Sequence, residues 1–307
     1  MGREKTVGLA LGGGGLRGAA HIGVLKVLEE EGVRVSYLSG CSAGSIVAVL
    51  YACGYNASEL ERIALGVHKE DIFDPLLDLC TLARVGLKLA GNFLRLPGRH
   101  LIRVPNGLLA GRRLEGWVYR LTGGASFDEV DIPTVVMACD LHSGEKVLFT
   151  SGAVAARLEG RMPRSVLVRE APVAAAVRAS SSIPGIFVPR YWGGRTLVDG
   201  ALVDNVPAEP LCLLGADVVL AVDLEYAGQQ DEGIDSVAEI LVQATDIMGQ
   251  ELTNLKLGRY ADVVIRPGIY DVGLTELERI AECIERGARA TRRAWPEIKT
   301  LLGREEK

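Results

Sequence analysis

The sequence predicts an α/β fold, a three-layer sandwich in which a mostly parallel central sheet is flanked by helices on both faces. Three observations lead to it. Short apolar runs alternate along the chain with longer segments of helical periodicity. Glycines mark many of the junctions between them. The 307 residues are 48% hydrophobic, which supplies enough apolar material for a large core and argues against a disordered or fibrous protein.

The elements follow from the local patterns in chain order. Residues 6–11, TVGLAL, predict a buried strand, and the glycine turn after it leads into a helix over 18–31 that ends at Gly32. A second strand is expected over 35–40, with helices over 43–53 and 57–67. Further on, we expect strands over 132–141, 145–151, 195–200, 217–224 and 261–267, and helices over 171–181, 208–215, 236–258 and 275–295. Such alternation is typical of a parallel sheet with crossover helices.

One segment, residues 74–111, interrupts the alternation. Its mainly apolar sequence contains spaced basic residues at Arg84, Lys88, Arg95, Arg99 and Arg103. Two interpretations stay open: a helical hairpin that packs on the sheet with snorkelling side chains, and a cap that faces a membrane. With no repeat or convincing linker in the chain, we expect one domain over residues 1–307, with the core motifs at about 6–210 and the C-terminal helices packed on that core.

Composition narrows the classes of function. The net charge of -5 and a pI near 5.6 argue against a general nucleic-acid binder. The six cysteines are scattered, without the CxxC pairs of zinc sites, and we expect reduced thiols and a cytoplasmic protein. Residues 35–58 carry no charge, but their Gly, Ser and Asn content favours a buried strand and helix over a membrane span. The sequence indicates no metal site and no cofactor, and it sets no oligomeric state.

A candidate nucleophile lies where the second strand meets its helix. Gly40, Ser42 and Gly44 spell GxSxG in the segment GCSAGS. In a strand-turn-helix context this pattern is typical of a nucleophile elbow, because the tight turn exposes the serine hydroxyl and the helix N-terminus favours developing negative charge. Ser42 is therefore the expected nucleophile.

The base that would activate Ser42 is not an obvious histidine. His68 and His100 fall in or near the irregular segment, His142 lies in an expected hairpin turn, and His21 is in the first helix. Asp199, at the end of a predicted strand and before a turn, would instead reach the same sheet edge as Ser42. An ordinary turn aspartate is the alternative interpretation of this DG pair.

Four ordered motifs together resemble the patatin-like phospholipase family, especially its bacterial members. They are GGGGLRG after the first strand, GCSAG after the second, ASSSIPGIFVPRYW, and DGALVDNVP. The resemblance spans about the first two thirds of the chain. It implies a Ser42–Asp199 dyad without histidine, which agrees with the failed search for a histidine base.

The resemblance also assigns the glycine run. Backbone N–H groups of Gly13, Gly14 and Gly15 are expected to form an oxyanion hole, where side chains would block the substrate. Arg17 matches a basic position of the family's loop, with support of the loop or of the anion as its two open roles. The residues that support the motifs are Gly18, Gly40, Gly44, Gly200 and Ala201.

We therefore expect a serine acyl hydrolase that cleaves lipid esters, of phospholipase A or lysophospholipase type. Its partners would be phospholipid, lysophospholipid or another acyl ester, without nucleic acid, and 74–111 would supply any peripheral membrane contact. One alternative is a dinucleotide-binding protein, since GxGxxG between strand and helix is also that fingerprint, although no acid ends the second strand. Another is a catalytically silent lipid-binding scaffold.

Overall fold

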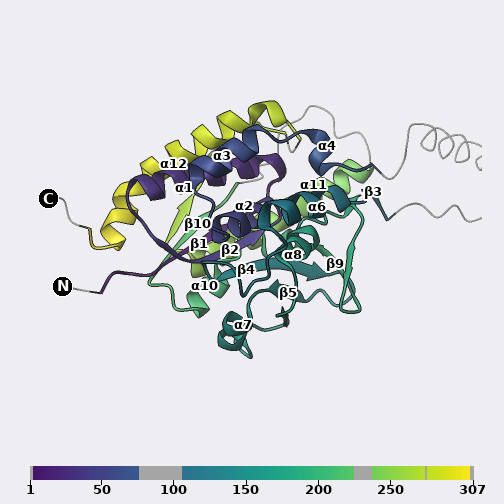
Figure 1. Cartoon of the computed structure of the whole chain (residues 1–307), viewed down its shortest axis with the longest axis horizontal. Helices are drawn as coiled ribbons and strands as arrows, with labels where there is room; N and C mark the ends of the chain where they lie inside the picture. Colours follow the sequence, from purple (N-terminus) through teal and green to yellow (C-terminus); the bar gives the residue numbers. More distant parts are fainter. Residues whose placement is uncertain (1–2, 76–105, 225–236, 274, 305–307) are drawn as a thin grey trace, which may run out of the picture.

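A computed structural model describes residues 3–75, 106–224, 237–273 and 275–304 (Figure 1). Its strands are β1 (Val7–Leu11), β2 (Val35–Cys41), β3 (Gly107–Leu109), β4 (Thr134–Asp140), β5 (Lys146–Phe149), β6 (Ser165–Val168), β7 (Gly185–Phe187), β8 (Arg190–Trp192), β9 (Arg195–Asp199), β10 (Val218–Val222) and β11 (Val263–Ile265). Its helices are η1 (Gly15–Ala19), α1 (Ala20–Glu30), α2 (Ala43–Ala52), α3 (Ala57–Leu65), α4 (Lys69–Ile72), α6 (Arg112–Thr122), α7 (Gly152–Leu158), α8 (Val173–Ser180), α9 (Ala201–Asp204), α10 (Glu209–Leu213), α11 (Val237–Tyr260), η2 (Leu277–Arg279) and α12 (Ile280–Leu301).

The main sheet is mixed but mostly parallel, as predicted. Its strand order is β11-β10-β1-β2-β4-β5-β6, and β9 pairs with both β4 and β8. The strands from β11 to β4 are parallel to one another, whereas β5 and β9 run antiparallel to β4. Because parallel strands end at the same edge, the loops after β1 and β2 come together there.

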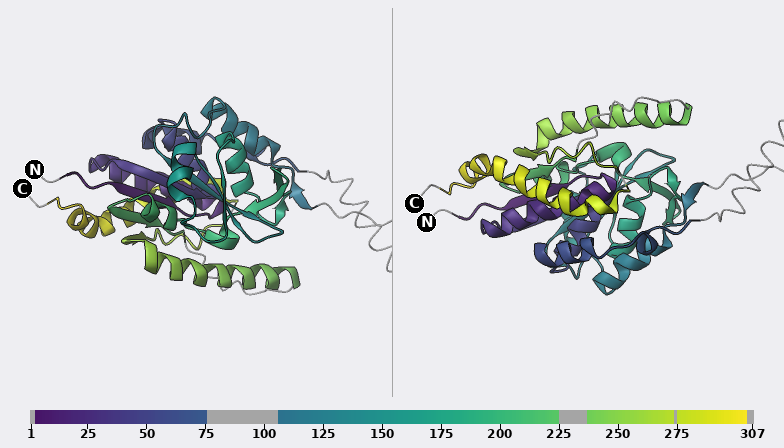
Figure 2. Two further views of the ribbon diagram at one scale, coloured as in Figure 1. Left: turned by 90° about the horizontal axis from the view of Figure 1, so that it is seen from below. Right: turned by 90° about the horizontal axis from the view of Figure 1, so that it is seen from above.

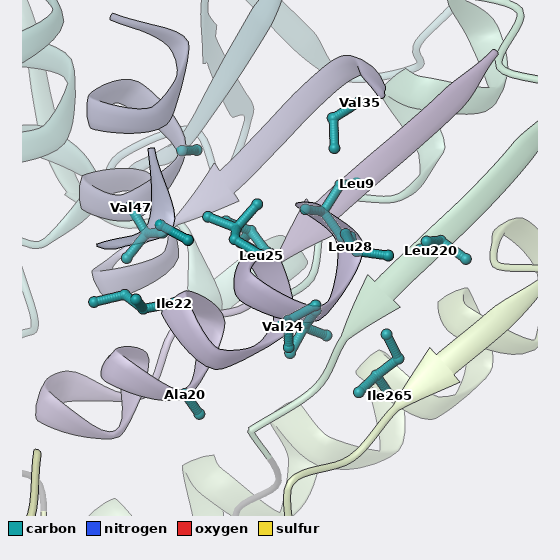
Figure 3. Packing of buried hydrophobic residues seen from close by; sticks show 14 of the residues in the cluster. Leu9, Ala20, Ile22, Val24, Leu25, Leu28, Val35, Val47, Leu220 and Ile265 are labelled. Carbon is teal, nitrogen blue, oxygen red and sulfur yellow. The ribbon is translucent and has the colours of Figure 1, made fainter. Parts of the chain in front are cut away.

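Both faces of this sheet are buried, which makes the three layers. Alternate residues of one strand belong to different clusters: Leu9 and Leu11 pack with α1, α2 and α12, whereas Ala10 packs with α10 and α11. Figure 3 shows the first of these clusters, with Val24 and Leu28 of α1 lying over Leu9 and Leu220 of neighbouring strands. A strand buried on both faces reads as a continuous apolar run, which is why β1 is VGLAL.

The C-terminal helix α12 packs directly on α1 (Figure 1). Two glycines allow the close crossing, since a Cβ on Gly23 would collide with the backbone of Ile284 and one on Gly287 with the backbone of Ala20. On the other side of the body α11 lies as an outlying helix, drawn in light green in Figure 2. No helix within the described ranges is both long and apolar enough to cross a bilayer.

Some elements differ from expectation. The helix predicted from Gly18 begins instead at Ala20, after the 3-10 turn η1. The short strands β6, β7 and β8 carry too little apolar pattern to be predicted from three or four residues. Most of the 74–111 segment, including all five of its basic residues named above, lies outside the described residues. Its last part forms β3, which pairs with β7 in a separate two-stranded sheet.

Candidate active site

Ser42 lies in a strained turn between β2 and α2. Its φ of 49° and ψ of -123° fall in a region that residues other than glycine rarely adopt, at a cost of about 1–3 kcal/mol. Hydrogen bonds hold the turn: the Ser42 amide donates to Ser180 Oγ over 2.8 Å, and Ser45 Oγ donates to the Ser42 carbonyl over 2.6 Å. Ser180 is itself anchored, because its hydroxyl donates to the Met137 carbonyl over 2.6 Å.

The glycines of this elbow are explained by close backbone approaches. A Cβ on Gly40 would lie 2.6 Å from the Gly44 carbonyl oxygen. A Cβ on Gly44 would collide with the Leu11 carbonyl at the end of β1. Both distances are shorter than a real Cβ contact. Glycine at position 40 therefore lets the elbow close on itself, and glycine at position 44 lets it pack against the end of β1.

Asp199 reaches Ser42 because β2 and β9 share one edge of β4. Strand β2 pairs with β4 up to Cys41 opposite Met137, and β9 takes over at the next position, with Asp199 opposite Ala138. The Ser42 side chain lies close enough to the Asp199 carboxylate to lower the pKa of that carboxyl. The following Gly200 begins α9, and a Cβ there would lie 2.5 Å from the Met137 carbonyl oxygen.

The surroundings of Asp199 favour its neutral form more than water does. Burial raises the pKa of this carboxyl from 3.8 to about 6, although interactions with Ala201, Ser42 and Cys41 oppose the shift. The Ala201 amide donates to Asp199 Oδ1 over 2.9 Å and the Cys41 thiol donates to it over 3.5 Å, while the Ser42 side chain lies near the carboxylate. A base whose pKa lies closer to neutrality than that of a free aspartate is better matched to proton transfer at physiological pH.

The glycine loop after β1 packs against the elbow, and this corrects the expected reason for its glycines. A Cβ on Gly13 would lie 3.0 Å from the Ser42 Cβ and 2.7 Å from Asn205 Oδ1, and one on Gly14 would lie 2.7 Å from Leu224 Cδ1. A Cβ on Gly18 would lie 2.6 Å from that of Ala43. Side chains are therefore excluded by the protein's own elbow and core, not by a substrate alone.

One of the three expected oxyanion donors is already engaged. The Gly13 amide donates to both the side-chain oxygen of Asn205 at 3.1 Å and its carbonyl at 3.3 Å. Within the described residues, the amides of Gly14 and Gly15 have no hydrogen-bond acceptor in the protein. Gly15 has a φ of 58°, a conformation that favours glycine. The geometry thus leaves two amides, not three, free to meet a developing oxyanion.

Two further side chains hold the loop in place. The ring of His21 is fully buried, and its Nε2 lies 2.7 Å from the Gly12 carbonyl. Burial lowers the His21 pKa to about 4, so the ring is neutral at pH 7 and Nε2–H donates to that carbonyl. Arg17 is also buried, and its Nε donates to the Gly14 carbonyl over 3.2 Å. Of the two roles left open for Arg17, this contact favours support of the loop.

The other described histidines also have places away from Ser42. His142 Nε2 lies 3.2 Å from Thr196 Oγ1 in the turn after β4, and His68 precedes α4. Sequence reasoning missed Asn205, Ser180 and the loop contact of His21. Asn205 and Ser180 lie inside the quoted motifs, but their partners Gly13 and Ser42 lie far away along the chain, and only the folded structure brings them together.

Sequence comparison finds a family model and relatives that match most of this chain. The family model described as patatin-like phospholipase matches residues 9–212, about two thirds of the chain. An uncharacterized NTE family protein of Mycobacterium tuberculosis is 30% identical over 72% of this chain and 49% of its own length. Patatin-like phospholipase domain-containing protein 6 of mouse is 27% identical over 87% of this chain and 16% of its own length. The chain thus spans about half, or less, of these curated relatives.

Among solved structures, human GIVD cytosolic phospholipase A2 shares the fold. With its methyl γ-linolenyl fluorophosphonate inhibitor and terbium chloride bound, it matches with a TM-score of 0.51 at 14% identity, over 99% of this chain and 60% of that one. A second structure of human GIVD cytosolic phospholipase A2 also gives a TM-score of 0.51, at 12% identity, over 97% of this chain and 60% of that one.

Proposed function

The chain belongs to the patatin-like phospholipase family, and from this premise we propose that it is a serine acyl hydrolase of lipid esters that uses a Ser42–Asp199 dyad. The observation that carries the proposal is the position of the Ser42 side chain, which lies at a strained strand-helix turn and close enough to the buried Asp199 carboxylate to lower its pKa. A nucleophile paired with a base in a strained turn is the arrangement that nucleophilic catalysis requires.

The proposed reaction has two halves. Asp199 takes the Ser42 proton as the serine oxygen attacks the acyl carbonyl, and the carbonyl oxygen becomes negative beside the amides of Gly14 and Gly15. The protonated Asp199 then gives its proton to the departing alcohol, which leaves an acyl-serine. In the second half, Asp199 removes a proton from water, the hydroxide attacks the acyl-serine, and the proton returns to Ser42 as the acid is released.

Two features make an aspartate adequate as the base. Burial keeps the Asp199 pKa near 6, which reduces the mismatch with the serine hydroxyl. The N-terminus of α2 follows Ser42 directly, and its dipole favours negative charge at the serine oxygen. The groups that carry the reaction are all protein groups, so we propose that hydrolysis requires no metal and no cofactor.

The substrate class follows from the family and not from the site geometry. We propose a carboxylic ester of a lipid, with phospholipid or lysophospholipid as the first candidates. The relatives, which include a patatin-like phospholipase domain-containing protein and a cytosolic phospholipase A2, support this choice. The glycine loop supports it against the dinucleotide alternative, because Asn205 already holds the Gly13 amide that a pyrophosphate would need.

The test combines labelling with turnover. Purified protein would be treated with a fluorophosphonate probe, the labelled peptide located by mass spectrometry, and hydrolysis of a soluble short-chain ester and of phosphatidylcholine measured. We expect the label on Ser42, and a loss of several orders of magnitude in turnover in Ser42→Ala and Asp199→Asn, with little further loss in the double variant. Ser143→Ala, an exposed serine in the turn after β4, is the matched control and should retain full activity.

Three results would contradict the proposal. A label on another residue would remove Ser42 from the mechanism. Near-normal turnover by folded Asp199→Asn would remove the base. Saturable NAD(P) or FAD binding without any ester hydrolysis would favour the dinucleotide-binding alternative, and lipid binding without labelling would favour the silent scaffold.

A further inference from the structure

The helix α11 turns a mostly polar face toward the body of the protein and an apolar face toward solvent. Among the described side chains, its inner face meets the body through several polar contacts together with the buried Leu257. Gln250 Nε2 lies 3.3 Å from the buried carboxylate of Asp223, and Lys256 Nζ lies 2.9 Å from that of Asp204. One turn on, the Tyr260 hydroxyl donates to Glu209 over 3.1 Å. A surface helix of a globular protein normally presents its apolar side to the core.

The outer face of α11 is apolar instead. Five large hydrophobic side chains stay exposed, at 55% for Ile240, 55% for Ile247, 73% for Met248, 36% for Leu252 and 74% for Leu255. Their spacing of seven, one, four and three residues places them on one side of a helix, along about 22 Å of its length. We call these five residues the α11 stripe.

The α11 stripe is too small for a stable dimer interface. Five aliphatic side chains with these exposures make a patch on the order of 500 Å², whereas a standard protein interface buries about 800 Å² on each partner. Among the α11 side chains that the structure describes, the exposed charged ones are Glu251 and Arg259, whose charges cancel. A narrow, neutral apolar stripe is instead suited to shallow insertion between lipids without net head-group charge.

The position of α11 relative to the candidate active site fits a lipid surface. Lys256 Nζ donates to the Val203 carbonyl over 2.7 Å, and Val203 belongs to α9, which follows Asp199 by one residue. Nearer its N-terminus, Asp246 lies close enough to Arg17 of the glycine loop for an electrostatic interaction. The helix thus lies along the flank of both loops that form the site (Figure 2). The exposure of the five hydrophobic side chains places the α11 stripe on the side away from the body.

From these observations we propose that the α11 stripe is a docking surface for a neutral phospholipid membrane, which brings the Ser42 edge of the sheet to its lipid substrate. This inference rests on the proposed lipid hydrolysis for its purpose, but docking itself requires only the stripe. The polar contacts of the inner face keep α11 on the body while its apolar side enters the interface.

The experiment measures docking and hydrolysis separately. The variant Met248→Glu/Leu255→Glu places two charges on the stripe. Leu65→Glu/Tyr119→Glu is the matched control, because these side chains are 54% and 55% exposed on α3 and α6, across the body from α11. Co-flotation with phosphatidylcholine vesicles would be measured in the Ser42→Ala background, so that the vesicles stay intact. Turnover would be measured with Ser42 present, on the same vesicles and on a soluble short-chain ester.

We expect the stripe variant to bind vesicles at least tenfold more weakly than the parent and to lose vesicle hydrolysis in proportion, with soluble ester turnover unchanged. The control should match the parent in all three measurements, and thermal melts should show all variants folded. Unchanged flotation of the stripe variant, or an equal loss in the control, would overturn the proposal. So would a concentration-dependent dimer that the stripe variant dissociates, because a second copy would then occupy the stripe. Flotation of the Ser42→Ala parent alongside absent ester turnover in the unmutated protein would refute only the hydrolase.

Discussion

Replacement of Asp199 by Asn is expected to stabilise the fold at alkaline pH while it removes ester turnover. Burial raises the pKa of Asp199 to about 6 from 3.8, so the folded protein holds this proton where the unfolded chain has lost it. The contribution of the neutral carboxyl to stability is fully present below about pH 4 and is lost as the pH rises through about 6. A rise of about two pKa units corresponds to about 3 kcal/mol.

Asparagine avoids this cost because it is uncharged and has nearly the same shape. Its oxygen can still accept from the Ala201 amide, and its NH2 group can donate to Ser42 Oγ. Urea unfolding at pH 8 should therefore give Asp199→Asn a free energy of unfolding about 1–3 kcal/mol above that of the unmutated protein. The difference should shrink toward zero at pH 4, where both proteins are neutral at this position.

Asp271→Asn is the control of opposite sign. Arg286 and Arg279 donate to the Asp271 carboxylate and hold its pKa well below the ordinary value, so this variant should lose stability at pH 8. Two results would contradict a costly buried charge at Asp199: an Asp199→Asn variant no more stable than the unmutated protein at pH 8, or a stability advantage that is the same at both pH values. In the first case the ionised carboxylate is well solvated or paired, and in the second the effect is unrelated to its charge.

Three other predictions concern turnover. Because the ionised form of Asp199 is the base, kcat/KM should fall tenfold per pH unit below about pH 6. His21 cannot cause this fall, since its pKa is about 4. A kcat/KM that stays constant down to pH 5 would contradict Asp199 as the base. Asn205→Ala removes the side-chain acceptor of the Gly13 amide and should lower kcat about ten- to a hundredfold with KM nearly unchanged. A change in KM alone would mean that the glycine loop only binds substrate. Hydrolysis of a soluble ester should survive EDTA, since the proposed mechanism uses no metal, and strong calcium dependence would oppose it.

The parts of the site that could be predicted from sequence are those fixed by local geometry. A serine between two glycines at a strand-helix junction predicts an elbow, and the structure gives Ser42 the positive φ of that turn. An aspartate at the end of a strand predicts a side chain at the sheet edge, where Asp199 lies. The alternating strands and helices likewise predicted the sheet and its layers, because period and length are properties of single segments.

The parts that could not be predicted depend on register between distant segments. No local pattern states that β9 continues along β4 from the point where β2 stops, yet this pairing sets Asp199 beside Ser42. The same applies to the capture of the Gly13 amide by Asn205, which lies 192 residues away and reduces the free loop amides to two. The reversed faces of α11 also escaped prediction, because a mixed pattern along a helix does not say which side meets the body.

The burial of Asp199 connects the stability of the fold to the choice of base. A histidine base would titrate near neutrality without help, but a free aspartate would be too weak a base for a serine hydroxyl. Desolvation by the packed edge of β4 raises the pKa of Asp199 to about 6. The same desolvation destabilises the folded state when the carboxylate is charged. The hydrogen bonds from Ala201 and Cys41 limit that penalty without abolishing the shift. A protein of this design therefore needs a tightly packed site, and a substitution that lets water reach Asp199 should weaken the base even if it leaves every catalytic atom in place.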